Sequence, residues 1–118
     1  MSNKVAREEL TKLYGYRCFL LGVLNEHNPL TYHHIEPKKR ATVKNGALLA
    51  RFEHNLFNKV QEHKPRIADD VNCGFQEYKK TKSILLLAEL RNEIIEEIYS
   101  LGYEIEDTGK LLVLKRVA

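Results

Sequence analysis

Residues 30–63 restrict the fold of this chain most, because their hydrophobic pattern changes from the period of a strand to that of a helix. Residues 30–35 and 47–50 read as two short strands, and Asn45-Gly46 between them is a strong turn signal. Residues 52–63 then carry apolar side chains at helical spacing. The pattern predicts strand, loop, strand and helix in that order.

The rest of the chain adds helices and a second hairpin. Residues 4–14 predict one helix, and residues 66–81 predict a short helix that Gly74 weakens. The strongest helix signal covers residues 83–101, and a hairpin over residues 103–115 follows it. These elements together predict the α+β fold class.

Length and charge limit the class of protein. The 118 residues fit a single domain, and no apolar run approaches the ~18 residues that cross a membrane. The N-terminus has no apolar signal core, so we expect a cytoplasmic protein. Residues 1–82 hold 15 Lys and Arg against 9 Asp and Glu, whereas residues 83–118 hold 4 against 7. The basic first part favours a polyanionic partner.

The chemically informative residues are His33, His34, His54 and Asn58. Neighbouring side chains of a strand point to opposite faces, so the first two histidines cannot both be core packing. His54 and Asn58 lie four residues apart, on one face of a predicted helix. If this helix packs on the hairpin, two imidazoles and an amide oxygen form a site for one divalent ion. The remaining imidazole, His34, then suits a general base.

These residues stand in an order that resembles a known family. The matching segments are Leu30-Thr31-Tyr32-His33-His34-Ile35-Glu36-Pro37, Asn45-Gly46-Ala47-Leu48-Leu49 and Glu53-His54-Asn55. Together they resemble the HNH endonucleases, also called ββα-metal nucleases. The resemblance implies a single domain over residues 1–118, with an HNH-like module at 14–64 and a helical and hairpin extension at 65–118. It also implies a ββα-metal core with an N-terminal helix, a long C-terminal helix and a hairpin, and a phage or mobile-element origin.

The resemblance assigns a role to each matched residue. His34 corresponds to the general base, and His33, His54 and Asn58 correspond to ligands of one divalent ion. That ion is most often Mg²⁺ in the family, with Mn²⁺, Ni²⁺ and Zn²⁺ as alternatives. Asn45 corresponds to the asparagine that holds the loop between the strands through backbone hydrogen bonds.

The chain departs from the many family members that bind a structural zinc through two CxxC pairs. The corresponding positions hold Cys18, Leu21, Ala50 and Glu53, so only one thiol remains. Because a structural zinc site needs four ligands, we expect no structural zinc here. Apolar side chains are expected to replace it, with Leu20, Leu21, Leu24, Phe52 and Phe57 as candidates.

Two surfaces are candidates for partners. The basic side chains near the motif suit DNA phosphates, and they are Lys38, Lys39, Arg40, Lys44 and Arg51. The helix at 83–101 has more apolar residues than one stripe requires, which leaves a homodimer as a second expectation. The sequence therefore predicts an HNH-type DNA endonuclease. The alternatives are an inactive nucleic-acid-binding module on the same scaffold, or a protein-interaction domain that uses the 83–101 helix.

Overall fold

The computed structural model describes residues 1–117 of the chain, and within them the protein is a compact α+β domain with four helices and two antiparallel hairpins. The bounds of these elements are α1 (Asn3–Tyr14), β1 (Leu30–His34), β2 (Gly46–Ala50), α2 (Arg51–His63), α3 (Pro65–Thr81), α4 (Ile84–Ser100), β3 (Tyr103–Asp107) and β4 (Leu112–Arg116).

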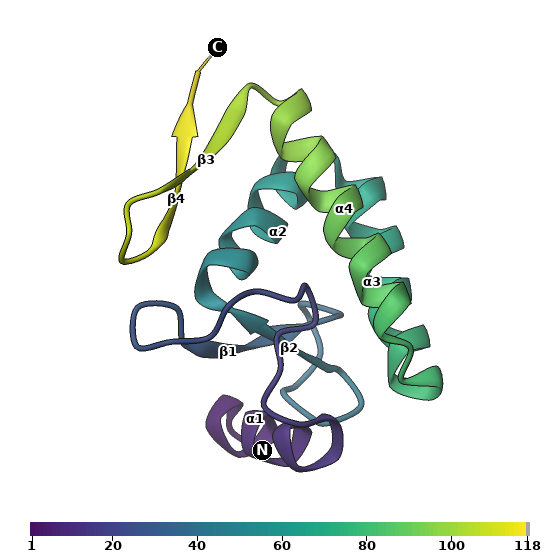
Figure 1. Ribbon diagram of the computed structural model, residues 1–118. Coiled ribbons are helices and arrows are strands. Elements are labelled where there is room, and N and C mark those ends of the chain that lie inside the picture. Colours follow the sequence, from purple (N-terminus) through teal and green to yellow (C-terminus); the bar gives the residue numbers. More distant parts are fainter. Residues whose placement is uncertain (118) are drawn as a thin grey trace.

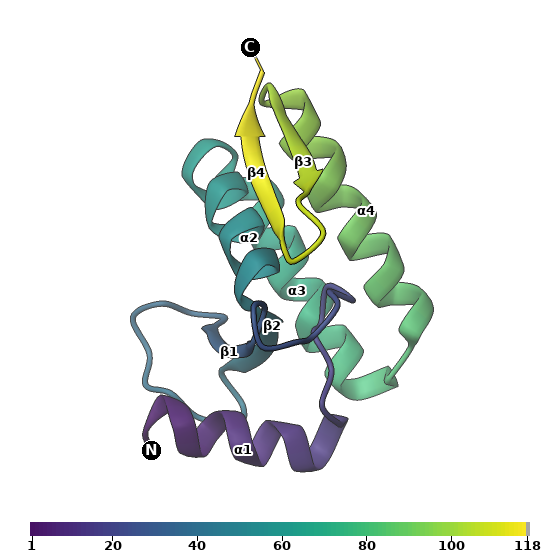
Figure 2. The same ribbon diagram turned by 60° about the vertical axis from the view of Figure 1, so that its left-hand side comes forward.

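The first hairpin lies between helices. β1 and β2 pair in the register Leu30↔Ala50 to His34↔Gly46, and α1 covers one of their faces. Helices α2 and α3 lie on the other side of the hairpin (Figures 1 and 2). Because both faces are covered, every residue of β2 is buried.

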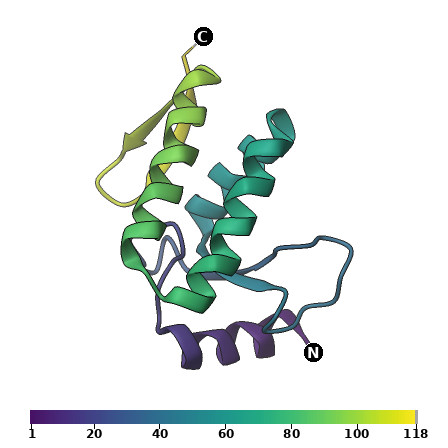
Figure 3. The ribbon, with the colours of Figure 1, turned by 90° about the vertical axis from the view of Figure 1, so that its right-hand side faces the viewer.

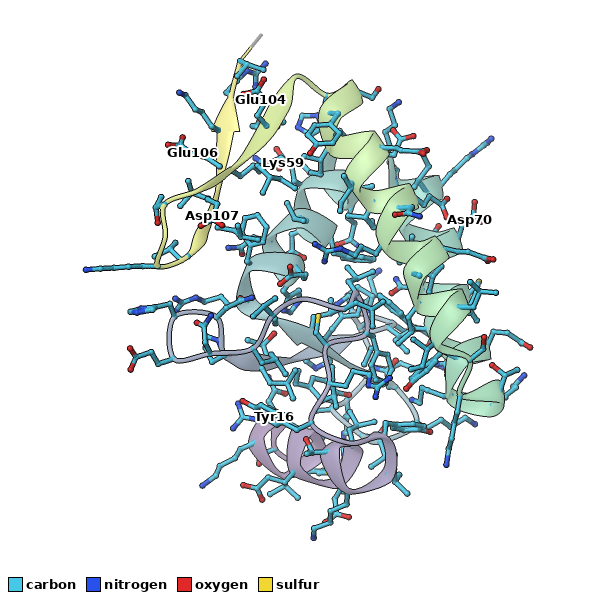
Figure 4. All side chains as sticks on the ribbon, viewed as in Figure 1. Tyr16, Lys59, Asp70, Glu104, Glu106 and Asp107 are labelled. Carbon is cyan, nitrogen blue, oxygen red and sulfur yellow. The ribbon has the colours of Figure 1, made fainter. Side chains whose placement is uncertain are left out.

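Helices α2, α3 and α4 pack against one another and complete the core. Figure 3 shows α3 and α4 side by side, joined by a short turn at Lys82 and Ser83. The second hairpin, β3–β4, packs beside α2 and α4. In Figure 4, Lys59 of α2 extends toward this hairpin, and its ammonium nitrogen lies 5.5 Å from the centre of the Tyr103 ring.

The helices expected at residues 4–14, 52–63 and 83–101 are confirmed to within a residue or two. Ser83 caps α4 by accepting a hydrogen bond from the backbone nitrogen of Leu86, and Gly102 with φ of 88° follows its end. The expectation of a short helix at 66–81 was wrong in length, because α3 has 17 residues and continues through Gly74.

Asn45-Gly46 does form a turn, but not the two-residue hairpin turn that this pair usually signals. Gly46 donates its backbone N–H to the carbonyl of Val43, which closes a four-residue turn. Neither residue has a positive φ, unlike the central residues of a type I′ turn. The turn ends an eleven-residue connection, residues 35–45, which we call the β1–β2 loop.

The apolar stripe of α4 is largely used inside this chain. Leu87, Leu90, Ile94 and Ile98 are buried, and only Ile84 and Leu85 of the apolar run at its start are exposed. Across residues 1–117, none of the helices combines the length and the apolar character that a membrane crossing requires.

Candidate active site

The structure brings His33 and His54 together. His33 lies near the end of β1 on the side facing α2, and only 4% of its surface is exposed. Its ring packs against the rings of Phe57 and Phe75, with centroid distances of 4.4 and 5.8 Å. His54 stands one turn into α2, and its Nε2 lies 3.3 Å from Nδ1 of His33.

A hydrogen bond from α3 fixes the tautomer of His33. The Nδ2 group of Asn72 donates to the carbonyl of Ile35 at 3.3 Å, which sets the orientation of this amide. The amide oxygen therefore faces Nε2 of His33, at 2.8 Å. Because an amide oxygen only accepts, Nε2 of His33 carries the hydrogen and Nδ1 is left with a lone pair.

A second hydrogen bond fixes the tautomer of His54 in the same way. The hydroxyl of Thr31 donates its one hydrogen to the carbonyl of Leu49 at 2.6 Å. It can therefore only accept from Nδ1 of His54, which lies 2.9 Å away. Nε2 of His54 is then the unprotonated nitrogen. Two lone pairs, on His33 and His54, face each other across 3.3 Å with no hydrogen to share.

Burial keeps both rings neutral. It lowers the pKa of His33 from 6.5 to about 4, and the neighbouring histidines lower it further, while the hydrogen bond from Asn72 acts in the opposite sense. Burial also lowers the pKa of His54, with a smaller contribution from His34. Neutral imidazoles with a free ring nitrogen and a fixed second nitrogen are the form in which histidine binds metals.

His34 is placed differently from His33. Its ring is half-buried and makes an edge contact with the ring of Tyr32, at a centroid distance of 4.8 Å. Tyr32 is held in turn by Thr42, whose backbone carbonyl and N–H both bond to the tyrosine hydroxyl. His34 lies close enough to the other two histidines to lower their pKa values.

A complete protein ligand set is not present. Within residues 1–117, no three side chains of His, Cys, Asp or Glu form a group that could hold a metal ion. Asn58 follows His54 by one turn of α2 and its side chain is exposed. The chelating atoms that the structure brings together are therefore the two imidazole nitrogens, which would leave most positions around an ion open.

Asn45 bonds only to backbone groups of the β1–β2 loop. Its side-chain oxygen accepts from the N–H of Glu36 at 2.8 Å, and its Nδ2 donates to the carbonyls of Glu36 and Arg40. These bonds join the two ends of the loop. Four of the five candidate basic residues belong to this loop, namely Lys38, Lys39, Arg40 and Lys44.

Arg51 does not join them. It begins α2 next to Ala50, at the opposite end of the first hairpin from the β1–β2 loop. Its guanidinium donates to the carbonyl of His27 at 2.9 Å.

The positions that correspond to zinc ligands hold a different cluster. Cys18 is buried, and its sulfur accepts from the N–H groups of Leu20 and Ala50. Glu53 is fully buried and accepts from Asn28 at 3.0 Å and from Arg91 at 3.4 Å. The expectation of a purely apolar replacement was therefore incomplete. Among its candidates, Leu20, Phe52 and Phe57 are buried, and Leu21 and Leu24 are partly buried.

Sequence reasoning missed Thr31 and Asn72, the two residues that orient the histidines. Asn72 had a detectable signal, because it shares the buried face of α3 with Val71 and Phe75 and is the polar residue there. Thr31 had none, since a threonine in a strand is ordinary.

Comparison with protein-family models, with curated proteins and with solved structures gives no match to this chain.

Proposed function

We propose that this protein is a metal-dependent endonuclease of the HNH type that hydrolyses DNA phosphodiester bonds. The observation that carries the proposal is the pair of unprotonated nitrogens on His33 and His54, 3.3 Å apart. Two imidazole nitrogens each about 2.1 Å from one ion, at angles between octahedral and tetrahedral, are roughly 3.0–3.4 Å apart. The pair therefore fits one shared cation.

The order of elements supports the same proposal. The hairpin β1–β2 runs directly into α2, with His33 and His34 on the first strand and His54 on the helix. This is the arrangement that a ββα-metal core requires. In this proposal Asn58 and water or phosphate oxygens complete the coordination.

The proposed chemistry uses His34 as the general base. His34 takes a proton from a water molecule whose oxygen forms the new bond to phosphorus, while the bond from phosphorus to the 3′ oxygen breaks. The leaving oxygen takes a proton from solvent. A divalent ion, when bound, stabilises the negative charge of the phosphate and of the leaving oxygen. Thr31 and Asn72 hold the two chelating rings in the required tautomers.

The test is plasmid nicking with Mg²⁺, Mn²⁺, Ni²⁺ or Zn²⁺, comparing the wild-type protein with His34→Ala. We expect the variant to lose about 10²–10⁴-fold in rate, as when a general base is removed. His63→Ala is the matched control, because His63 is an exposed histidine at the far end of α2. Equal cleavage by wild type and His34→Ala would refute the assignment of the base.

Metal binding is measured separately by calorimetry. We expect one ion per chain for the wild-type protein, and at least tenfold weaker binding for Thr31→Val, whose side chain cannot hydrogen-bond to His54. Salt-dependent DNA binding without cleavage in any of the four metals would favour the inactive nucleic-acid-binding module. Failure to bind either DNA or metal would favour the protein-interaction domain.

A further inference from the structure

Lys79 of α3 is bonded to the end of the β1–β2 loop. Its ammonium nitrogen donates to the carbonyls of Val43, Lys44 and Gly46, at 2.6, 3.0 and 2.8 Å. The residue is half-buried, and no carboxylate of the described residues lies within ion-pair distance of it. Its charge is therefore balanced only by the three carbonyl dipoles.

Other side chains hold the same part of the loop. Gln76, one turn earlier on α3, donates to the carbonyl of Lys44 at 3.2 Å. The hydroxyl of Tyr32 bonds to the backbone of Thr42, and the side chain of Asn45 joins the loop ends. Residues 42–46 are thus fixed from the strand and from α3.

The first part of the loop is exposed and surrounds a hollow. Residues 36–40 are all exposed. The hollow measures about 500 Å³, and it is lined by Glu36, Lys38, Lys39, Arg40, Thr42, Lys44, Asn45 and Gln76. Four of these residues are cationic and one is anionic. Glu36 is paired with Lys39 at 2.8 Å, so three cationic side chains have no carboxylate partner there.

We propose that this hollow is a phosphate-binding subsite for the DNA backbone, separate from the phosphate that is cleaved, and that Lys79 is the positioning residue that holds it in shape. The inference rests on the proposed function for the identity of the polyanion. Clustered Lys and Arg side chains around one concavity bind phosphate oxygens by charge and hydrogen bonding.

Lys79 contributes in two ways. Its three bonds fix the turn that carries Lys44, and they occupy carbonyl oxygens that would otherwise repel a phosphate. The subsite is also close to the proposed base. Lys38 follows His34 by four residues, so the chain between them spans at most about 14 Å. That length corresponds to only a few phosphates along one strand.

The first test measures binding of a labelled 20-base-pair DNA duplex in EDTA, where no metal-dependent cleavage occurs, over a series of salt concentrations. We expect Lys38→Gln combined with Lys44→Gln to reduce the slope of log K against log salt by roughly 0.9 for each phosphate that the protein no longer neutralises. The matched control is Lys110→Gln combined with Lys115→Gln, which removes the same charge from the second hairpin and its turn. Equal slopes for the two double variants would overturn the subsite.

The second test concerns Lys79 itself. We expect Lys79→Met to raise KM for DNA about tenfold with little change in kcat, and to increase amide hydrogen exchange at residues 42–46. A purely structural role would instead lower thermal stability and leave KM of the folded protein unchanged, which would overturn the positioning role. If Lys79→Met does not fold, Gln76→Ala removes a single loop bond and should raise KM by a smaller factor; an unchanged KM then counts against the proposal.

The outcomes for the subsite and for the endonuclease are distinguishable. Loop-dependent DNA binding without cleavage would keep the subsite and reject the nuclease. Cleavage that is insensitive to both loop variants would keep the nuclease and reject the subsite.

Discussion

His33 is the single residue whose surroundings differ most from water, and this gives the metal-free protein a sensitivity to acid. Its pKa is about 4 in the folded protein, against 6.5 for an unperturbed histidine. Between these values the unfolded chain binds more protons than the folded one, so the free energy of unfolding falls as the pH is lowered from 6.5 to 4. The lowered pKa of His54 acts in the same direction.

We expect His33 to account for a loss of about 3 kcal/mol over this interval, since each pKa unit corresponds to ~1.4 kcal/mol. Urea unfolding in EDTA at several pH values measures it. In His33→Phe the loss should be much smaller, because the ring volume remains and the titrating group is gone. An identical pH dependence in both proteins would contradict the neutral, buried state of His33.

The residues around His33 also show how far the sequence can predict a site. The histidines are recognisable because their type, order and spacing are encoded within one segment. Asn72 and Lys79 are not, because they reach residues 33 and 43 from a helix more than thirty positions away. A hydrophobic pattern indicates which face of a helix is buried, but it does not specify which neighbour that face will contact.

At the scale of elements, the contact between α3 and α4 depends on Gly74. A Cβ atom at this position would lie 2.4 Å from Cδ2 of Leu90, so the missing side chain lets the two helices approach. The sequence indicated Gly74 as a weak point of a short helix, and in isolation it is one. Packing against α4 outweighs that local preference, which is why α3 continues through it.

We expect Gly74→Ala to destabilise the protein by about 1 kcal/mol, because the overlap with Leu90 outweighs the better helix propensity of alanine. In a Leu90→Ala background the same substitution should become stabilising, since the added methyl group then has space. Chemical denaturation of the four proteins of this cycle measures the change of sign. A substitution that is equally stabilising in both backgrounds would show that the helices are not in close contact at this point.

At the scale of the whole molecule, Arg91 connects parts of the chain that are distant in sequence. It extends from α4, donates to the carbonyl of Leu20 at 2.7 Å, and pairs with the buried Glu53 of α2. A buried carboxylate needs such partners, because desolvation of an unpaired charge is costly. In this protein the ion pair takes the place that a bound zinc occupies in the resemblance to HNH nucleases.

We therefore expect Arg91→Met to destabilise the protein by about 3 kcal/mol, because it leaves the charge of Glu53 without its cationic partner. The double variant Glu53→Met and Arg91→Met should lose less than Arg91→Met alone. Thermal unfolding followed by circular dichroism compares the three proteins. A double variant that is less stable than Arg91→Met would show that the pair itself, and not the unpaired charge, dominates.

The bonds from α3 also set a limit on dissecting this protein. Asn72 closes the inner side of His33, and Lys79 secures the loop that follows His34, yet both lie beyond the hairpin and helix that carry the histidines. If β1, β2 and α2 were grafted alone onto another scaffold, one imidazole would open to water and the loop would lose its anchor. The smallest portion worth transplanting extends to residue 81.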